Sequence, residues 1–373
     1  MGNVPNLRFP EFSGEWSSQP LTDFMNFKNG LNPDAKRFGR GTKFISVMDI
    51  LNNQYICYDN IRASVELQDG DIETYGVDYG DILFQRSSET LEDVGRANVY
   101  LDSKPAIFGG FVIRGKSKGN YNPLFFRYLL ASPTVRKRII VKGAGAQHFN
   151  IGQDGLSKVS LDIPRLSEQE KIGKLLQCVD ARIATQNKII EKLQSLIKGL
   201  AVALTTKKKA NIAISQCLEC HSSTLQESVV LSSGLCKVFG ANGLVGYKDV
   251  PQMNGDAILV IKDGSGVGTV FYAQGKFSVI GTLNYLTVIG NNDLRYLYFA
   301  LSVFNFQPYK TGMAIPHIYF KDYGKAKIYC PSFAEQKRVA NVLDKLESKL
   351  FVEQELLASF NQQKLYLLGK MFI

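Results

Sequence analysis

The spacing of apolar residues predicts two long helices that share one pattern. Between residues 167 and 204, apolar positions recur at alternating steps of three and four, a period that is typical of a coiled-coil seam. The seam positions are Ile172, Leu176, Val179, Ile183, Gln186, Ile190, Leu193, Ile197, Leu200 and Leu204. The same register returns 167 residues later, at Val339, Leu343, Leu346, Leu350, Glu353, Leu357, Phe360, Lys364, Leu367 and Met371. Each helix would be roughly 55 to 60 Å long, and each seam needs a partner.

The other helix is the obvious partner, and we expect the pair to be antiparallel. Gln186 and Glu353 are polar residues at the same place in the two seams. In an antiparallel pair only positions near the midpoints meet their counterparts, so these two would form a polar layer, within about one heptad turn, that sets the register. Ile172 would lie near the Met371 end of its partner, and two globular units would be roughly 50 Å or more apart.

Both helices begin after the same short motif. Pro164 and Pro331 are each followed by a hydroxyl or small residue and then by Glu-Gln, at 168–169 and 335–336. This order of residues is typical of a helix N-terminus.

The sequence before the first long helix predicts a globular unit of mixed α+β structure. Apolar or alternating runs cut by Gly and Asp favour strands at 43–47, 81–84 and 106–113. A helix is expected over 121–138. A glycine-rich loop follows at 142–150, and a last strand at 158–163.

A second pass through the same order follows a polar linker from about residue 207 to 227. Residues 255–260 echo the Gly-Asp-Ile-Leu run, 293–302 echo the helix, 310–319 echo the glycine-rich loop and 325–330 echo the last strand. The chain is therefore predicted to consist of a globular unit followed by a long helix, and this arrangement occurs twice. The second copy lacks a lead-in like that around Trp16, which leaves its start open.

Composition narrows the class of protein. The 373 residues are 45% hydrophobic, enough for two or at most three domains, and the net charge of +10 suggests a polyanionic partner. Positive and negative charges are nearly balanced in the predicted globular parts, so a nucleic-acid surface must be a local patch. The chain has no apolar run of membrane-span length and no signal-peptide pattern at its start, so we expect a soluble, cytoplasmic protein without a membrane partner.

Several motifs that could carry chemistry have plainer interpretations. Cys217-x-x-Cys220-His221 spells a c-type haem attachment site, but that site needs export and an apolar haem pocket, and a zinc half-site would lack a second ligand pair. The glycines of 264–269 follow a strand, yet the next segment also favours a strand, so a tight turn is the better interpretation. No P-loop occurs in the sequence.

No catalytic constellation emerges. Asn122-Pro123 is weakly similar to a base-holding loop of amino-methyltransferases, but it is also an ordinary helix start. His148 and His317 have no nucleophile or carboxylate fixed beside them by a motif.

What remains is recognition chemistry, of a kind that suits a nucleic acid. The two glycine-containing loops combine lysines, which suit phosphates, with amide, hydroxyl and imidazole groups, which suit base edges. The candidates in these loops are Lys142, Gln147, His148 and Asn150 in the first and Lys310, Thr311, His317 and Tyr319 in the second. Further basic candidates are Lys36, Arg37, Arg40, Lys43, Arg86, Arg96 and Lys262. A solvated surface loop is the alternative for all of them, and recurrence of the loop in both units favours a function.

The order of these features resembles one family, the specificity subunits of type I restriction-modification systems. The resemblance rests on Pro5-Asn6-Leu7-Arg8-Phe9-Pro10, on Gly-Asp-Ile-Leu at 80–83 and on the motif that opens each long helix. It implies a first target-recognition domain at 1–166, a first spacer helix at 167–206, a second recognition domain at 207–332 and a second spacer helix at 333–373.

The resemblance also implies a non-catalytic scaffold that reads a split site in double-stranded DNA. Its partners would be methyltransferase subunits, which bring S-adenosylmethionine, and restriction subunits, which bring ATP and magnesium, with no cofactor in this chain. Two alternatives stay open: a DNA-modifying enzyme, either a methyltransferase or a nuclease fragment, and a coiled-coil assembly factor without a DNA role.

Overall fold

The repeated seam lies on two long helices, α6 (Leu166–Thr205) and α9 (Phe333–Lys370), in the computed structural model, which describes residues 2–373. The chain forms two units. Unit 1 comprises the described residues up to Gln186 together with Leu356–Ile373, and unit 2 comprises Asn187–Glu355. Each unit therefore holds one part of each long helix.

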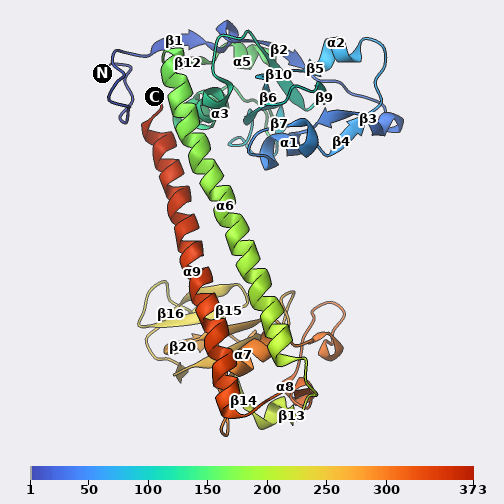
Figure 1. Ribbon diagram of the computed structural model, residues 1–373, viewed down its shortest axis with the longest axis vertical. Helices are drawn as coiled ribbons and strands as arrows, with labels where there is room; N and C mark the ends of the chain where they lie inside the picture. The colour runs from blue at the N-terminus through green and yellow to red at the C-terminus, as the bar shows by residue number, and fades with distance from the viewer. Residues whose placement is uncertain (1) are drawn as a thin grey trace. The chain divides into compact units, whose positions relative to one another are not determined.

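In unit 1 the two helical segments run in opposite directions. Ile172 and Leu176 of α6 share a buried core with Leu367 and Met371 of α9. Further along α6, Asp180 pairs with Lys364 at 2.7 Å between Oδ1 and Nζ. Positions further along α6 thus contact positions earlier along α9. The start of α6 lies beside the end of α9 (Figure 1). The expectation that Ile172 lies near Met371 is confirmed.

Unit 2 gives the same direction independently. Ala201 of α6 shares a core with Val339 and Leu343 of α9. Lys208, just beyond α6, lies 3.5 Å from Glu335 at the start of α9. The helical segments are antiparallel here too. The polar layer of Gln186 with Glu353, and the separation of the two units, stay predictions.

Unit 1 is built on two four-stranded sheets. The first is antiparallel throughout, in the order β2 (Met25–Asn29), β10 (Val112–Ser117), β6 (Ile82–Gln85), β8 (Ala97–Val99). The second has the order β4 (Ala63–Val65), β3 (Phe38–Ile45), β9 (Ala106–Phe108), β5 (Gly76–Val77). In this sheet β3 and β9 are parallel, while the outer pairs are antiparallel.

Unit 2 repeats both sheets strand for strand. The antiparallel sheet has the order β14 (Leu218–Ser222), β21 (Leu283–Val288), β18 (Ala257–Ile261), β19 (Val270–Ala273). The mixed sheet has the order β16 (Gly243–Lys248), β15 (Cys236–Gly240), β20 (Lys276–Val279), β17 (Met253–Asn254), and its central pair β15 and β20 is again parallel. The internal repeat and the α+β class are confirmed.

The segment around Trp16 that leads into unit 1 also has a counterpart in unit 2, contrary to expectation. In unit 1, β1 (Ser17–Pro20) pairs with β12 (Ser160–Ile163), and in unit 2 the shorter β13 (Ile212–Ala213) pairs with β22 (Lys327–Ile328). What unit 2 lacks is an equivalent of Trp16, whose ring packs edge-on against Phe125 at 6.1 Å and Phe372 at 6.5 Å between centroids.

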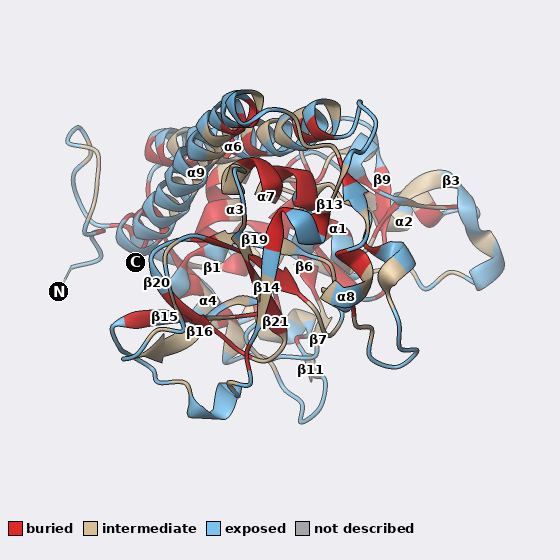
Figure 2. Cartoon of the chain, turned by 90° about the horizontal axis from the view of Figure 1, so that it is seen from below, coloured by how far each residue is buried: buried red, intermediate tan, exposed pale blue. Residues whose placement is uncertain are grey.

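Helices cover the antiparallel sheets. In unit 1 these are α3 (Pro123–Ala131) and α4 (Pro133–Ile140), and in unit 2 it is α7 (Leu294–Ser302), which is largely buried (Figure 2). Asn122 and Asp293 cap α3 and α7 in the same way, each accepting a hydrogen bond from the third backbone N–H of the helix at 2.9 Å. The Asn-Pro pair is therefore a helix start. Shorter helices are α1 (Val47–Asn52), α2 (Asp71–Tyr75), α5 (Gln153–Ser157) and α8 (Phe320–Tyr323).

Two predicted elements of unit 1 are in fact divided. The single helix expected over 121–138 breaks at Ser132, whose hydroxyl caps α4, because Pro133 has no N–H to continue the hydrogen bonds of α3. The run 106–113 is not one strand, since Gly109, Gly110 and Phe111 form a crossing between β9 and β10, which belong to different sheets.

Among the described residues, no helix is long and apolar enough to pass through a membrane.

Candidate nucleic-acid interface

The glycine-rich segment of unit 1 forms a loop that backbone hydrogen bonds close at its base. Ala144 and Asn150 exchange two bonds, with N···O distances of 2.9 and 2.8 Å. β11 (Phe149–Asn150) pairs with β7 (Ser87–Ser88), and Ile151 N–H donates to the carbonyl of Arg86 at 2.9 Å. The 144–150 loop is thus fixed to the chain that leaves β6, while its tip is exposed.

Unit 2 builds the same loop from different residues. Thr311 and His317 exchange two bonds at 2.9 and 2.8 Å, and Ile318 N–H donates to the carbonyl of Lys262 at 2.9 Å. Lys262 follows β18 as Arg86 follows β6, so the two cations are structural equivalents. Asn150, rather than His148, is the counterpart of His317, because each closes the paired base of its loop.

Each loop needs a glycine at one position. Gly145 and Gly312 have φ of +143° and +88°. A Cβ at Gly145 would lie 2.0 Å from the carbonyl oxygen of His148, and one at Gly312 would lie 2.3 Å from that of Ile315. The tight fold of both loops therefore depends on the absence of a side chain there.

The candidate residues of the first loop come together at the surface. Gln147 and His148 are exposed at the tip. Asn150 is also exposed, and its amide contacts the Ser87 hydroxyl and donates to the carbonyl of His148 at 3.3 Å. Arg86 is half-buried, with Nη1 donating to the carbonyl of Gly110 at 3.3 Å. Amide and imidazole groups are thus presented to solvent at the tip of the loop, while the guanidinium of Arg86 lies against the crossing between β9 and β10.

Lys142 stands at the base of this loop beside an open polar hollow of about 520 Å³, which Arg138 and Lys158 also line. Arg138 pairs with Asp162 at 2.7 Å and Lys158 with Asp154 at 2.6 Å. Of these three cations, only Lys142 has no carboxylate partner in the described part of the chain. Its charge is the one best placed to meet a phosphate.

Arg136 holds the backbone segment against which the base of the loop packs. The sequence did not suggest this role. Its Nη2 donates to the carbonyl oxygens of Glu92 and Val94 at 2.8 and 2.7 Å. Val94 in turn packs under Gly143, where an added Cβ would lie 2.7 Å from its methyl group. Burial and the neighbouring positive charge of Arg96 lower the pKa of Arg136 to about 10.

The second loop carries an aromatic and cationic flank. The rings of His317 and Tyr319 lie 5.0 Å apart edge-on, and Lys321 Nζ lies 5.1 Å from the Tyr319 ring centroid. His317 Nδ1 lies 3.2 Å from the carbonyl oxygen of Ile315. Because a carbonyl can only accept, Nδ1 is the donor in this hydrogen bond. Thr311 is exposed and Lys310 half-buried at the same base.

The other basic candidates are mostly occupied within the protein. Arg37 pairs with Asp71, Arg40 Nη2 lies 2.7 Å from Glu66, and Lys43 Nζ donates to the carbonyl of Ile61 at 2.8 Å. Lys36 is exposed. Arg96 pairs with Asp93 at 2.6 Å, and Lys262 pairs with Asp263. Arg40 and Lys43 tie β3 to the chain on either side of β4, and Arg37 holds the start of α2. The structure does not bring Arg96 into the loop.

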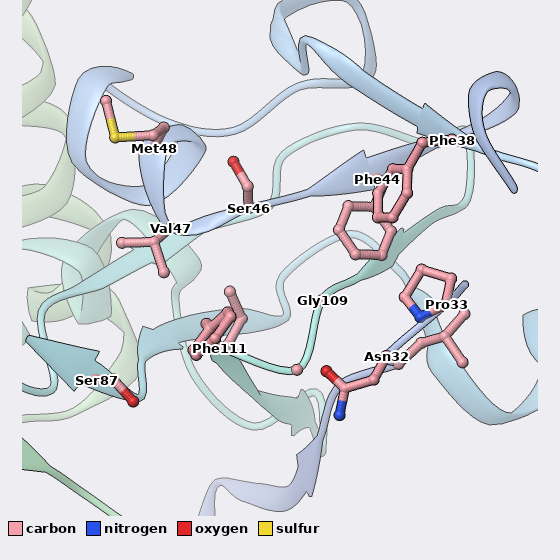
Figure 3. Close-up of a pocket in the computed structure, with 13 residues that line it drawn as sticks. Asn32, Pro33, Phe38, Phe44, Ser46, Val47, Met48, Ser87, Gly109 and Phe111 are labelled. Carbon is pink, nitrogen blue, oxygen red and sulfur yellow. The ribbon is translucent and has the colours of Figure 1, made fainter. Parts of the chain in front are cut away.

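A mostly apolar pocket of about 450 Å³ lies next to the first loop. Ser87 stands at one end of it and Phe38 and Phe44 at the other, with Phe111 and Asn32 between them (Figure 3). Phe111 is 69% exposed. Phe111 does not stand out in the sequence, because the apolar run 106–113 predicts a single strand in which it is one more apolar residue.

The motifs with alternative chemistry lie in structural positions. Cys217 is buried in the core of unit 2, and His221 stacks on Tyr285 at 4.8 Å and hydrogen-bonds Thr287 Oγ1 at 2.9 Å. Val270 begins β19, so the glycines of 264–269 form a turn between strands. Among residues 2–373, no group of three or more His, Cys, Asp or Glu side chains could hold a metal ion.

A duplicated α+β unit with a braced polar loop, set on antiparallel helical segments, defines the class of this protein. The chain belongs to the family described as type I restriction modification DNA specificity domain, whose sequence model matches residues 13–195 and 223–362.

Individual relatives agree with this family. The chain is 26% identical over 211 residues to a putative type I restriction enzyme specificity subunit of Methanocaldococcus jannaschii, which covers 55% of this chain and 49% of that protein. It is 24% identical over 110 residues to the EcoprrI specificity subunit of Escherichia coli, covering 30% of this chain and 27% of that protein. The chain thus matches about half or less of the length of these relatives.

Solved structures share the fold. The S subunit of a type I restriction-modification system from M. genitalium has a TM-score of 0.66 at 17% identity and covers 99% of both chains. A chain from a structural study of complex assembly in a type I system has a TM-score of 0.59 at 13% identity, covering 95% of this chain and 96% of its own.

Proposed function

We propose that this chain is the non-catalytic specificity subunit of a type I restriction-modification complex and that it reads a split site in double-stranded DNA. The observation that carries the proposal is the recurrence of one braced loop, at the same place in the same sheet topology, in both units. The closed base and the positive-φ glycine recur while the exposed tip residues differ, which supports a fixed frame that presents different recognition groups.

In this proposal unit 1 reads one half-site through the 144–150 loop and unit 2 reads the other through the 311–317 loop. Lys142 and Lys310 meet phosphates, and the tip side chains meet base edges. Methyltransferase and restriction subunits dock on the assembled chain. They supply S-adenosylmethionine, ATP and magnesium, and all bond-making steps occur in them.

A domain exchange tests this function. Residues 1–160 are replaced by those of a relative with another target, and the site is determined by sequencing methylated DNA from cells that carry the whole system. We expect one half-site to change while the other half-site and the gap stay the same. A change in both halves, or in the gap, would contradict readout by separate units.

An activity assay separates the proposal from a DNA-modifying enzyme. The purified chain is incubated alone with DNA and S-adenosylmethionine, and then with its methyltransferase subunits. Adenine methylation is expected only in the second case. Product from the chain alone would show a catalytic site of its own, and a methyltransferase complex that methylates without sequence preference would favour a purely structural role.

A further inference from the structure

The two loops differ in the chemistry of their tips. Met313 is fully exposed and Ile315 is 66% exposed, although both lie between the paired residues Thr311 and His317. Counting from the paired base, Met313 takes the position of Ala146 and Ile315 that of His148 in unit 1. Unit 2 therefore presents two large aliphatic side chains where unit 1 presents a small residue and an imidazole.

The apolar tip is held in a shape that keeps these side chains in solvent. Gly312 provides a turn at φ +88° that a Cβ would block, and His317 Nδ1 donates to the carbonyl of Ile315 at 3.2 Å. A backbone fixed in this way loses little conformational entropy on binding. The side chains are thus arranged for contact with another surface and not for burial in unit 2.

Cations flank the tip. Lys310 precedes the loop directly, and Lys321 lies over Tyr319 just after it. An apolar centre between positive charges matches a duplex groove, in which phosphates line both rims and base edges form the floor. In the major groove the apolar group on a base edge is the 5-methyl group of thymine.

We propose that the 311–317 loop reads its half-site through thymine 5-methyl groups, with Met313 and Ile315 as the contacting side chains. This inference rests on the proposed function, because it requires that the loop of unit 2 faces DNA. The first loop, with Gln147 and His148, reads by hydrogen bonds instead. The two half-sites are therefore recognised by different kinds of contact.

Removal of the methyl group tests the inference directly. The full chain is assembled with its methyltransferase subunits, and its site is selected from random duplexes. Each thymine in the site is then replaced in turn by deoxyuridine, which lacks only the methyl group. We expect affinity to fall about fourfold per contacted methyl, or ~0.8 kcal/mol, in one half-site only. 5-Bromodeoxyuridine, which restores bulk at that position, should restore affinity.

A double variant assigns the effect to the loop. In Met313→Gln with Ile315→Gln, the penalty for deoxyuridine should disappear, because the apolar partner of the methyl group is gone. Val250→Gln, which makes the same kind of change at an exposed aliphatic residue of unit 2 outside the loop, is the matched control and should keep the penalty. Both tip residues are exposed, so the thermal unfolding midpoint should stay unchanged, and each single substitution provides a second measurement.

The outcomes distinguish this inference from the function it rests on. A complex that selects a specific site but tolerates deoxyuridine everywhere would overturn the thymine contact and leave DNA recognition intact. A deoxyuridine penalty that persists in the double variant would also overturn it. A wild-type complex with no sequence preference would overturn both.

Discussion

The side-chain oxygen of Gln169 accepts a hydrogen bond from the backbone N–H of Asn122 at 3.0 Å. Its amide nitrogen donates to the carbonyl of Pro164 at 3.0 Å. Gln336 repeats both bonds in unit 2, with Asp293 N–H at 2.8 Å and the Pro331 carbonyl at 2.9 Å. Gln169 thus connects the start of α6 to the residue that caps α3, and Gln336 connects the start of α9 to the residue that caps α7. Neither glutamine closes a capping box.

Substitution of this glutamine should destabilise the unit that contains it. Gln169→Leu leaves the Asn122 N–H without an acceptor in a partly buried place, which costs about 1–3 kcal/mol. Urea unfolding of the full chain measures the loss. Gln194→Leu makes the same change at an exposed position of α6 and should stay within about 0.5 kcal/mol. Equal effects of both substitutions would show that Gln169 is not a structural tie.

Asp180 should be essential for the docking of α9 onto unit 1. Its buried carboxylate contacts Lys364 at 2.7 Å and Arg127 at 3.4 Å, and it accepts from the Tyr128 hydroxyl at 2.8 Å. Asp180→Ala leaves two cations uncompensated, so we expect a loss of about 3–5 kcal/mol in the free energy of unfolding.

A matched control for Asp180 lies in the same unit. Asp154 pairs with Lys158, but both side chains are largely exposed. Asp154→Ala should change the stability by less than about 1 kcal/mol. If the two variants were equally stable in the same urea titration, the contact between α6 and α9 would not depend on Asp180.

Alanine at the loop glycines should weaken DNA binding without unfolding the chain. Gly145→Ala and Gly312→Ala force the carbonyls of His148 and Ile315 to move, since a Cβ would approach within 2.0 and 2.3 Å of them. Faster hydrogen exchange at the amides of the loop base should accompany the loss of affinity. Gly152→Ala is the control, because Gly152 lies just beyond the first loop and nothing lies within 4 Å of its added Cβ.

Substitutions in the first loop should distinguish side chains that contact bases from side chains that contact phosphates. Gln147→Ala or His148→Ala should cost about 1–3 kcal/mol of discrimination between cognate and random DNA if these side chains reach base edges. Lys142→Ala should weaken binding to both DNAs and reduce the salt slope by about 1. Binding titrations at several salt concentrations measure both effects. Equal losses on cognate and random DNA for all three variants would show that the loop touches only phosphates.

The long helices and the repeat were accessible from sequence because both depend on local spacing. A 3.5-residue seam and a motif that recurs 167 residues later need no knowledge of the rest of the fold. The braced loops were also located, because glycine marks a turn whatever surrounds it.

The ion pairs of the basic residues could not be predicted from the sequence. Arg37 and Arg40 resemble free cations in the sequence, and only the pairing of β3 with β4 brings Asp71 and Glu66 to them. The apolar tip of the second loop was overlooked for a different reason. Met313 and Ile315 are residue types common in cores, and only their exposure in the structure shows that no core covers them.

The antiparallel arrangement has a consequence for synthesis on the ribosome. Leu367, Met371 and Phe372 complete the hydrophobic core that contains Trp16 and Ile172. Domains generally fold in the order in which they emerge, but the unit that emerges first here is finished by residues that are translated after the whole of unit 2. Unit 2 lies wholly between the two parts of unit 1 in the sequence. The nascent first unit must therefore wait with part of its apolar surface uncovered until the whole of unit 2 has been made.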